Sequence, residues 1–198
     1  NGDLMSDLWI VMDVNLARLA APGGDSVHWT NSLGHAMLKS ASLVIGNNEI
    51  DRTTGLHMEV KWEVESDCNR DTNELVLRGS SKQQLVNWTH DGNTLDKDGN
   101  AVVQLYVKLP FFFTKARSQA LPVIALQYHD IRVKKSLRSK DDLLVFSNPA
   151  NKTLESANNG EIKSGFLMAN FVYLDSMERR LFASNAHEYL IKNLQVSD

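Results

Sequence analysis

The chain has 198 residues, of which 42% are hydrophobic and 23% are charged, and its formal net charge is −3. This length suits one β-sandwich domain or at most two small domains, and the composition is typical of a globular protein with a core. A weakly acidic chain lacks the basic excess of nucleic-acid-binding proteins, and no apolar run reaches the roughly 18 residues of a membrane-spanning helix. We therefore expect no direct contact with nucleic acid and no insertion into a membrane.

Two features narrow the class further. Cys68 is the single cysteine, so no intrachain disulfide can form. The densest basic run, Arg132 to Lys140, is interrupted by apolar residues at strand spacing, which indicates the solvated face of a strand. The fold therefore cannot depend on an intrachain disulfide, and the basic run does not indicate a binding site for a negatively charged partner.

The first predicted strand lies near the amino terminus. Every second residue from Leu8 to Leu16 is apolar and alternates with Trp9, Val11, Asp13 and Asn15, which places Leu8, Ile10, Met12, Val14 and Leu16 on the inward face. A second strand is expected over Ala36 to Ile45, and Gly46 with the two asparagines after it forms a turn that leads to Ile50.

The segment from Thr53 to Glu65 fits two patterns. Leu56, Met58, Val60 and alternate residues beyond them are apolar, which favours a strand. The same residues also form i,i+4 pairs, and Thr53 or Thr54 could cap a helix. Periodicity alone leaves both structures open.

The central part of the chain, residues 101–137, predicts strands around a phenylalanine cluster. Ala101, Val103, Leu105, Val107 and Leu109 share one face of a strand, which Pro110 ends because proline has no N–H to donate. Phe111, Phe112 and Phe113 follow, and then come an apolar run over Leu121 to Leu126 and an alternating strand over His129 to Leu137. Three consecutive phenylalanines need more than one surface to bury them.

The remaining segments are mostly loops and short elements. Asn87 to Asn100 predicts a hairpin or exposed loop, and Ser139 to Ile162 is weakly patterned. A strand is expected over Phe166 to Leu174, then a short helix capped by Asp175 with Glu178 in a capping box, and an apolar strand over Glu188 to Leu194. Strands with long loops and short helical pieces predict a β-sandwich of the jelly-roll or immunoglobulin kind.

No motif for catalysis or metal binding stands out. The histidines lack metal-ligand spacing, Asp96 to Asn100 places its glycine wrongly for a calcium loop, and no nucleophile elbow or phosphate loop is present. We therefore predict that the chain is not an enzyme and has no catalytic, cofactor-binding or metal-ligating residues. Asn87 and Asn151 match the glycosylation sequon, which matters only if the protein meets the glycosylation machinery.

Three ordered sequence blocks resemble the major capsid proteins of nucleocytoplasmic large DNA viruses, in the N-terminal jelly roll of that double jelly-roll lineage. The resemblance covers nearly the whole chain and departs only mildly, at Asn47-Asn48 and at Phe112. The blocks are His28 to Ala36 with Ile45-Gly46 and Glu49 to Gly55; Leu109 to Phe113 with Leu121 to His129; and Tyr173 to Asp175 with Glu178 to Arg180, Phe182-Ala183 and His187 to Ile191.

The resemblance implies an all-β fold, an eight-stranded jelly-roll β-sandwich with one or two short helices in the connections. It places a helix after Asp51, which favours helix for the ambiguous segment. It also implies that residues 1–198 are an N-terminal jelly roll, with a strand missing upstream and a second jelly roll downstream. Leu109 to Phe111 and Leu121-Pro122 are then expected where the chain passes from one sheet to the other, with the phenylalanines filling the seam.

The function implied by the resemblance is structural. Three copies would form a pseudo-hexagonal capsomer of an icosahedral outer shell, in contact with neighbouring capsomers and minor capsid proteins. The protein would lie in the virion, after assembly in the cytoplasm of the host cell. Loops such as Asp91 to Asn100 and Lys140 to Glu161 would point outward or pack between subunits.

Two alternatives remain at this stage. One is a single jelly-roll vertex or minor capsid protein, which would form pentamers. The other is a carbohydrate-binding jelly roll, for which Trp88 in its turn-rich surroundings is the candidate contact residue.

Overall fold

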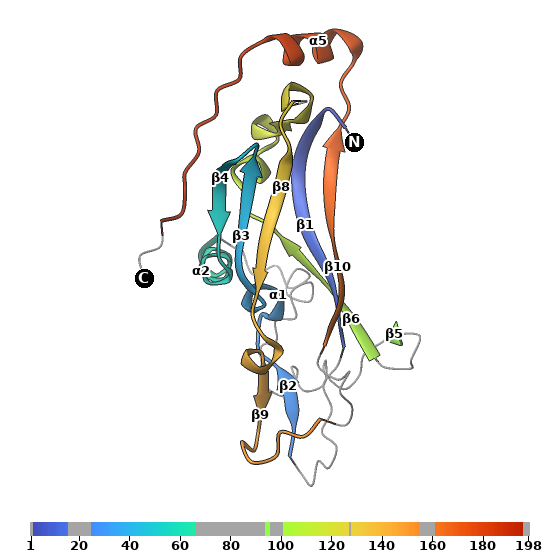
Figure 1. Cartoon of the computed structure of the whole chain (residues 1–198), viewed down its shortest axis with the longest axis vertical. Coiled ribbons are helices and arrows are strands. Elements are labelled where there is room, and N and C mark those ends of the chain that lie inside the picture. The colour runs from blue at the N-terminus through green and yellow to red at the C-terminus, as the bar shows by residue number, and fades with distance from the viewer. Residues whose placement is uncertain are drawn as a thin grey trace.

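The computed structural model describes residues 2–15, 25–65, 94–95, 101–126, 128–154 and 161–195. Within these residues two antiparallel sheets pack against each other, which confirms the all-β class (Figure 1). One sheet has the order β10 (Ile162–Val172), β1 (Leu4–Asn15), β6 (Ala101–Lys108) and β5 (Thr94–Leu95), and β7 (Leu121–Pro122) pairs with the start of β1. The other has the order β4 (Asn48–Thr53), β3 (Leu38–Ile45) and β8 (Ile131–Leu137). A short ladder joins β2 (Val27–Trp29) to β9 (Leu144–Phe146).

Helices occupy the connections between strands. The α-helices are α1 (Leu33–Ala36), α2 (Gly55–Glu65) and α5 (Ser176–Ser184), and short 3-10 helices cover Phe112–Thr114, Arg117–Gln119, Val123–Leu126 and Lys140–Asp142. None of the helices described is long and apolar enough to cross a membrane.

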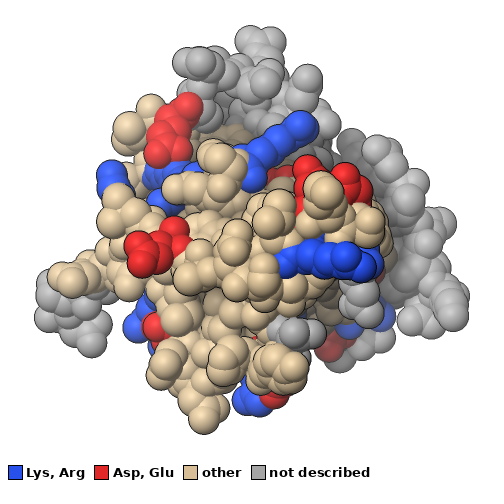
Figure 2. Space-filling model, turned by 90° about the horizontal axis from the view of Figure 1, so that it is seen from above, with Lys and Arg blue, Asp and Glu red and all other residues tan. Residues whose placement is uncertain are grey.

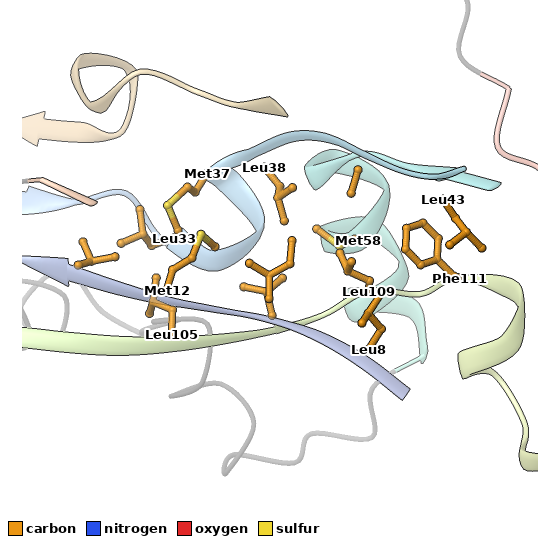
Figure 3. Packing of buried hydrophobic residues seen from close by; sticks show 14 of the residues in the cluster. Leu8, Met12, Leu33, Met37, Leu38, Leu43, Met58, Leu105, Leu109 and Phe111 are labelled. Atoms are coloured by element: carbon orange, nitrogen blue, oxygen red, sulfur yellow. The ribbon is translucent and has the colours of Figure 1, made fainter. Parts of the chain in front are cut away.

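Strand β1 lies between β10 and β6, and the described residues of its predicted inward face are buried. Val11 and Asn15 on its other face are also buried, so the two faces differ less than the prediction implied. Leu8, Ile10, Met12 and Val14 are all at most 3% exposed. Figure 3 shows side chains of β1 and β6 facing those of α1, α2 and β3 across the core. The residues that meet there include Leu8, Met12, Leu105 and Leu109 on one side and Leu33, Met37, Leu38, Leu43 and Met58 on the other.

The ambiguous segment is helical, as the resemblance implied. Thr54 Oγ1 accepts a hydrogen bond from the His57 N–H at 3.2 Å, and Met58 is buried against the core. Gly55 begins the helix where a Cβ would overlap the carbonyl oxygens of His35 and Leu38. This close approach explains why the helix starts at a glycine.

The second predicted strand needs a correction at its start. Residues 33–36 form α1, and β3 begins only at Leu38. Ser32, with a left-handed φ of 51°, turns the chain into this helix, and the Met37 N–H donates to the Leu33 oxygen at 2.9 Å. The predicted turn at Gly46 is confirmed, because this glycine has a φ of 62°.

The carboxyl-terminal part contains one confirmed element and one wrong prediction. Asp175 Oδ1 accepts from the N–H groups of Met177 and Glu178 at 2.9 and 2.8 Å, so the predicted cap of α5 is confirmed. Residues 188–194 were expected to form a strand, but they have no regular structure and pair with no described strand. Their alternation has another cause: Tyr189 and Ile191 pack against the core while Leu190 is 82% exposed.

Several predictions fall on residues outside the described ranges. These are Leu16 at the end of the first predicted strand, Cys68, Asn87, Trp88, the Asp96 to Asn100 turn and most of the predicted hairpin around it. Of that hairpin the structure describes only Thr94–Leu95, which pair with Val102 and Ala101.

Candidate assembly surfaces

The phenylalanine cluster fills the seam between the two sheets, as predicted. Phe111, Phe112 and Phe113 are 0%, 3% and 0% exposed. The Phe112 and Phe113 rings meet edge to face with their centroids 5.6 Å apart, and Phe112 also lies 5.7 Å from the Tyr189 ring. Such pairs stabilise the fold beyond the burial of their area, so they help to hold the seam together.

A buried carboxylate anchors the seam to the opposite sheet. Asp51 on β4 accepts a hydrogen bond from the Phe112 N–H at 2.8 Å. Burial raises the pKa of Asp51 above the ordinary aspartate value, although the backbone N–H groups of Phe112 and Arg52 and the charge of Lys115 oppose this rise. Asp51 therefore holds the segment between β6 and β7 against the opposite sheet. Because β6 and β7 both pair with β1, the predicted passage between the sheets at Leu109 to Phe111 is wrong. The chain changes sheet only after β7, on its way to β8.

A cavity of about 980 Å3 lies beside α2, lined among others by Trp9, His57, Trp62, Tyr106 and Lys115. The His57 Nδ1 atom is buried without a hydrogen-bond partner. Burial lowers the pKa of His57, and the positive charges of Lys61 and Lys115 lower it further. At neutral pH this histidine is therefore an uncharged part of the cavity wall.

A serine, a histidine and a carboxylate meet next to this cavity, but not in the order that a hydrolase needs. Ser32 Oγ donates to Glu59 Oε1 at 2.9 Å, and His35 Nδ1 lies 2.7 Å from Glu59 Oε2. Both groups thus bind the carboxylate, whereas in a catalytic triad the serine would donate to the histidine. The arrangement ties α1 to α2 and activates no nucleophile.

The predicted absence of a metal site stays a prediction. No group of three potential ligands gathers among the described residues. His28 Nδ1 lies 2.8 Å from the Trp29 oxygen and His187 Nε2 lies 2.7 Å from the Phe182 oxygen, so each of these histidines has a structural partner.

Apolar side chains remain exposed over β10 and α5. On β10, Phe166, Leu167 and Met168 are 54%, 47% and 40% exposed, and on α5 Met177 and Leu181 are 74% and 54% exposed. An exposed apolar patch of this kind marks a contact surface. Sequence reasoning identified the strand but missed its exposure. The signal was the near-continuous apolar run from Phe166 to Val172, since a strand that is apolar on both faces is normally covered on both.

The start of β1 is fastened to the start of α5. Asp3 Oδ2 accepts from the Leu174 N–H at 2.8 Å and from the Arg179 guanidinium at 2.9 Å. The hydrogen bond from the Leu174 backbone and the Arg179 charge hold the pKa of Asp3 below its ordinary value, against the opposing effect of burial. Sequence reasoning did not single out Asp3, because its partners lie far along the chain.

The charged surface matches the prediction of a solvated rather than a ligand-binding face. Arg132, Lys134 and Lys135 on β8 are exposed. Seen from the α5 end, acidic and basic side chains are interspersed with uncharged surface (Figure 2). That end of the molecule therefore presents no single-sign field.

Asn151, the second sequon residue, is engaged in its loop. Its Nδ2 donates to Asp25 Oδ2 at 3.0 Å, and Asn148 donates to the same oxygen at 3.2 Å. The side chain that a glycan would modify thus helps to hold the loop after β9 against residue 25.

A rigid two-sheet sandwich with exposed apolar surfaces is the architecture of a structural building block, which associates through its faces and edges. The comparisons agree with this class. Residues 1–175 match the family model described as major capsid protein N-terminus. The chain therefore belongs to the major capsid protein family of large DNA viruses.

Individual relatives support this assignment. The chain is 29% identical over 203 residues to capsid protein 1 of Acanthamoeba polyphaga mimivirus, covering 98% of this chain and 33% of that protein. It is 29% identical over 196 residues to the major capsid protein of Pyramimonas orientalis virus, covering 98% of this chain and 43% of that protein. These relatives are capsid proteins, which confirms the prediction that the chain is not an enzyme. The chain spans less than half the length of the relatives described here.

Solved structures support the fold. A crystal structure of PBCV-1 VP54, fitted into a reconstruction of the virophage Sputnik, matches with a TM-score of 0.72 at 24% identity. The match covers 98% of this chain and 41% of that one. A quasi-atomic model of the PBCV-1 virus capsid matches to the same extent. This likeness confirms the jelly-roll sandwich.

Proposed function

We propose that this chain is the first of two jelly rolls in a major capsid protein, and that three copies of the full protein form a pseudo-hexagonal capsomer of an icosahedral outer shell. Neighbouring capsomers and minor capsid proteins are the partners of this unit in the virion. Assembly takes place in the cytoplasm of the infected cell.

The observation that carries this proposal is the match of residues 1–175 to the family's N-terminal model. The relatives are at least twice as long as the part this chain covers, which leaves room for a second domain of similar size. If each polypeptide contains two packed jelly rolls, a capsomer made of three copies has six similar lobes.

The exposed surfaces suit this role. An obligate assembly interface buries about 2,000 Å2 or more and is rich in apolar residues. The apolar side chains on β10 and α5 would supply part of such an interface. Rigid sandwiches also suit a shell, since each subunit must present its contact residues in a fixed geometry.

Native mass spectrometry of the full-length product tests the proposal. We expect a trimer at micromolar concentration that persists on dilution, because obligate interfaces are large. A stable monomer would contradict the proposal, and a pentamer would favour the vertex-protein alternative. A glycan array on the same sample tests whether the protein is instead a carbohydrate-binding jelly roll. If it is, glycan binding should depend on Trp88.

A further inference from the structure

The cavity beside α2 has no part in the proposed function. Its volume of about 980 Å3 lies at the upper end of the range of small-molecule sites, roughly 300–1,000 Å3. Its walls come from β1, β4, α2 and β6, from the residues after the phenylalanine cluster, and from residues 192–194. The carboxyl-terminal segment that carries those last residues runs past β4 and α2 (Figure 1). Side chains distant in the sequence therefore converge on one space.

Positive charge predominates in the lining of this cavity. Among the described lining residues five carry a positive charge and two a negative charge. They are Arg52, Lys61, Lys108, Lys115 and Lys192, and Asp51 and Glu65. Of the two carboxylates, Asp51 is already engaged by the Phe112 N–H at 2.8 Å. Because a cleft lined by one sign of charge concentrates ions of the opposite sign, this lining favours a ligand with several negative charges.

The cations of the lining differ in their availability to a ligand. Lys108 and Lys61 each have a carboxylate partner, at 2.7 and 3.5 Å. No ion pair with a described residue is formed by the exposed side chains of Arg52, Lys115 and Lys192. Guanidinium and ammonium groups are the usual protein partners of phosphate groups. The three unpaired cations therefore suit a ligand with more than one phosphate.

Aromatic side chains form another part of the lining. Trp9, Trp62 and Tyr106 line the cavity and are all partly exposed. Neighbouring groups hold the two indoles in place: the His35 ring centroid lies 5.8 Å from that of Trp62, and Lys108 Nζ lies 5.7 Å from the centroid of the Trp9 ring. Nucleobases stack on aromatic side chains of this kind. The cavity thus combines surfaces for a planar ring with cations for phosphate.

We propose that this cavity binds a nucleoside polyphosphate, with the base against the aromatic side chains and the phosphates on Arg52, Lys115 and Lys192. A simple inorganic anion would leave the rings without a partner, and an uncharged aromatic compound would leave the cations unpaired. Thr114 and Asn193 add hydrogen-bonding groups for the sugar. The inference goes beyond the proposed function and does not depend on it.

Isothermal titration calorimetry of the full-length protein tests the inference with ATP, adenosine and tripolyphosphate. ATP should bind at least about tenfold more tightly than either fragment, because each fragment lacks one group of contacts. Tripolyphosphate that binds as tightly as ATP would overturn the inference, since the rings would then have no role. Failure of ATP to bind at millimolar concentration would also overturn it. Tighter binding of a short oligodeoxyadenylate than of ATP would overturn it in favour of nucleic acid.

A matched pair of lysine variants links binding to this cavity. Lys115 and Lys134 are both exposed, but Lys115 lines the cavity and Lys134 lies on β8 outside it. Lys115→Glu should raise the Kd for ATP about tenfold or more, because it replaces a phosphate partner with a like charge. Lys134→Glu should leave the Kd unchanged. Equal Kd values in the two variants would overturn the inference.

A second variant and a spectroscopic measurement keep the inference testable if Lys115→Glu does not fold. Lys192→Glu changes a residue in a segment without regular structure, and it should raise the Kd for ATP in the same way. ATP should also quench tryptophan fluorescence, and Trp62→Phe should reduce this quenching. ATP binding that leaves tryptophan fluorescence unchanged would place the ligand elsewhere and overturn the inference.

Discussion

Strand β1 has two neighbours, and the two sides of the molecule that they form differ sharply. On the β6 side the core-facing Leu105 and Val107 are 0% exposed. On the β10 side the core-facing Leu167 is 47% exposed, although it lies opposite the fully buried Ile10. The comparison shows that alternation in the sequence decides which face of the sheet a side chain is on. How deeply that side chain is buried depends on whether other strands or helices cover it.

The largest loss of stability is expected for substitutions of the fully buried phenylalanines in the seam. Phe113→Ala should lower the free energy of unfolding by about 3–5 kcal/mol, because the surrounding side chains cannot collapse into the space. Phe111→Ala should fall in the same range. Urea denaturation measures both effects, with an unchanged m-value as the control for two-state behaviour. A wild-type midpoint in both variants would show that the seam is not packed as described.

The next prediction compares Ile10 and Leu167 directly. In the 198-residue chain Ile10→Ala should cost about 2–5 kcal/mol, while Leu167→Ala should cost well under half as much, because Leu167 is half exposed. Equal costs in the short chain would remove the contrast between the two sides.

A smaller loss of stability is expected when the N-terminal cap of α5 is removed, because this helix lies on the surface. Asp175→Ala removes the acceptor for the N–H groups of Met177 and Glu178, and it should cost about 1 kcal/mol. Ser176→Ala, one residue later, is the matched control with no capping bond to lose. Thermal unfolding should separate the two variants, and equal Tm values would mean that the cap contributes nothing to the fold.

The smallest effect is a difference in pH dependence between two aspartates. The lowered pKa of Asp3 means that its contribution to stability is present above the pKa of an unfolded aspartate, about 3.9, and is lost as the pH falls through its folded pKa. The raised pKa of Asp51 has the opposite sign: its contribution is present below about 3.9 and is lost as the pH rises through the folded pKa.

Denaturation midpoints measured from acid to neutral pH check these signs. Asp3→Asn should reduce the loss of stability that occurs as the pH falls below about 3.9. Asp51→Asn should reduce the loss of stability that occurs as the pH rises above about 3.9. A common effect of both substitutions on the same limb would contradict the assignment of the two pKa directions.

Local pattern was enough to predict several strands and one helix cap. β1 and β6 were found from alternation, and the cap of α5 from Asp175 and Glu178, because each depends on neighbours in the sequence. The helix over Gly55–Glu65 needed the family resemblance, since strand and helix periods coincide there. In β1, β6 and the cap of α5, by contrast, the local sequence preference agrees with the fold.

The rest depends on contacts that no single segment encodes. Residues 188–194 alternate like a strand, yet they form no ladder with a described strand. Their alternation instead reflects packing of Tyr189 and Ile191 against the core, and the Tyr189 hydroxyl donates to the Ala120 oxygen at 3.1 Å. The Asp3 to Arg179 contact joins residues 176 positions apart, so no local rule could predict it. The exposure of Leu167 likewise follows from an edge, which only the arrangement of whole strands reveals.

The fastening at Asp3 has a mechanical consequence. β1 and β10 are antiparallel, so residues 2 and 174 leave the sheet at the same end. Tension between the segments that flank them would pull the two strands apart from that end, breaking one rung of the ladder at a time. Asp3, bound to the Leu174 N–H and to Arg179, is the first link to bear such a load. The backbone of Asp3 adds to this link, since its N–H donates to the Val172 oxygen at 3.2 Å. We therefore expect the resistance of this module to unzipping to begin at Asp3.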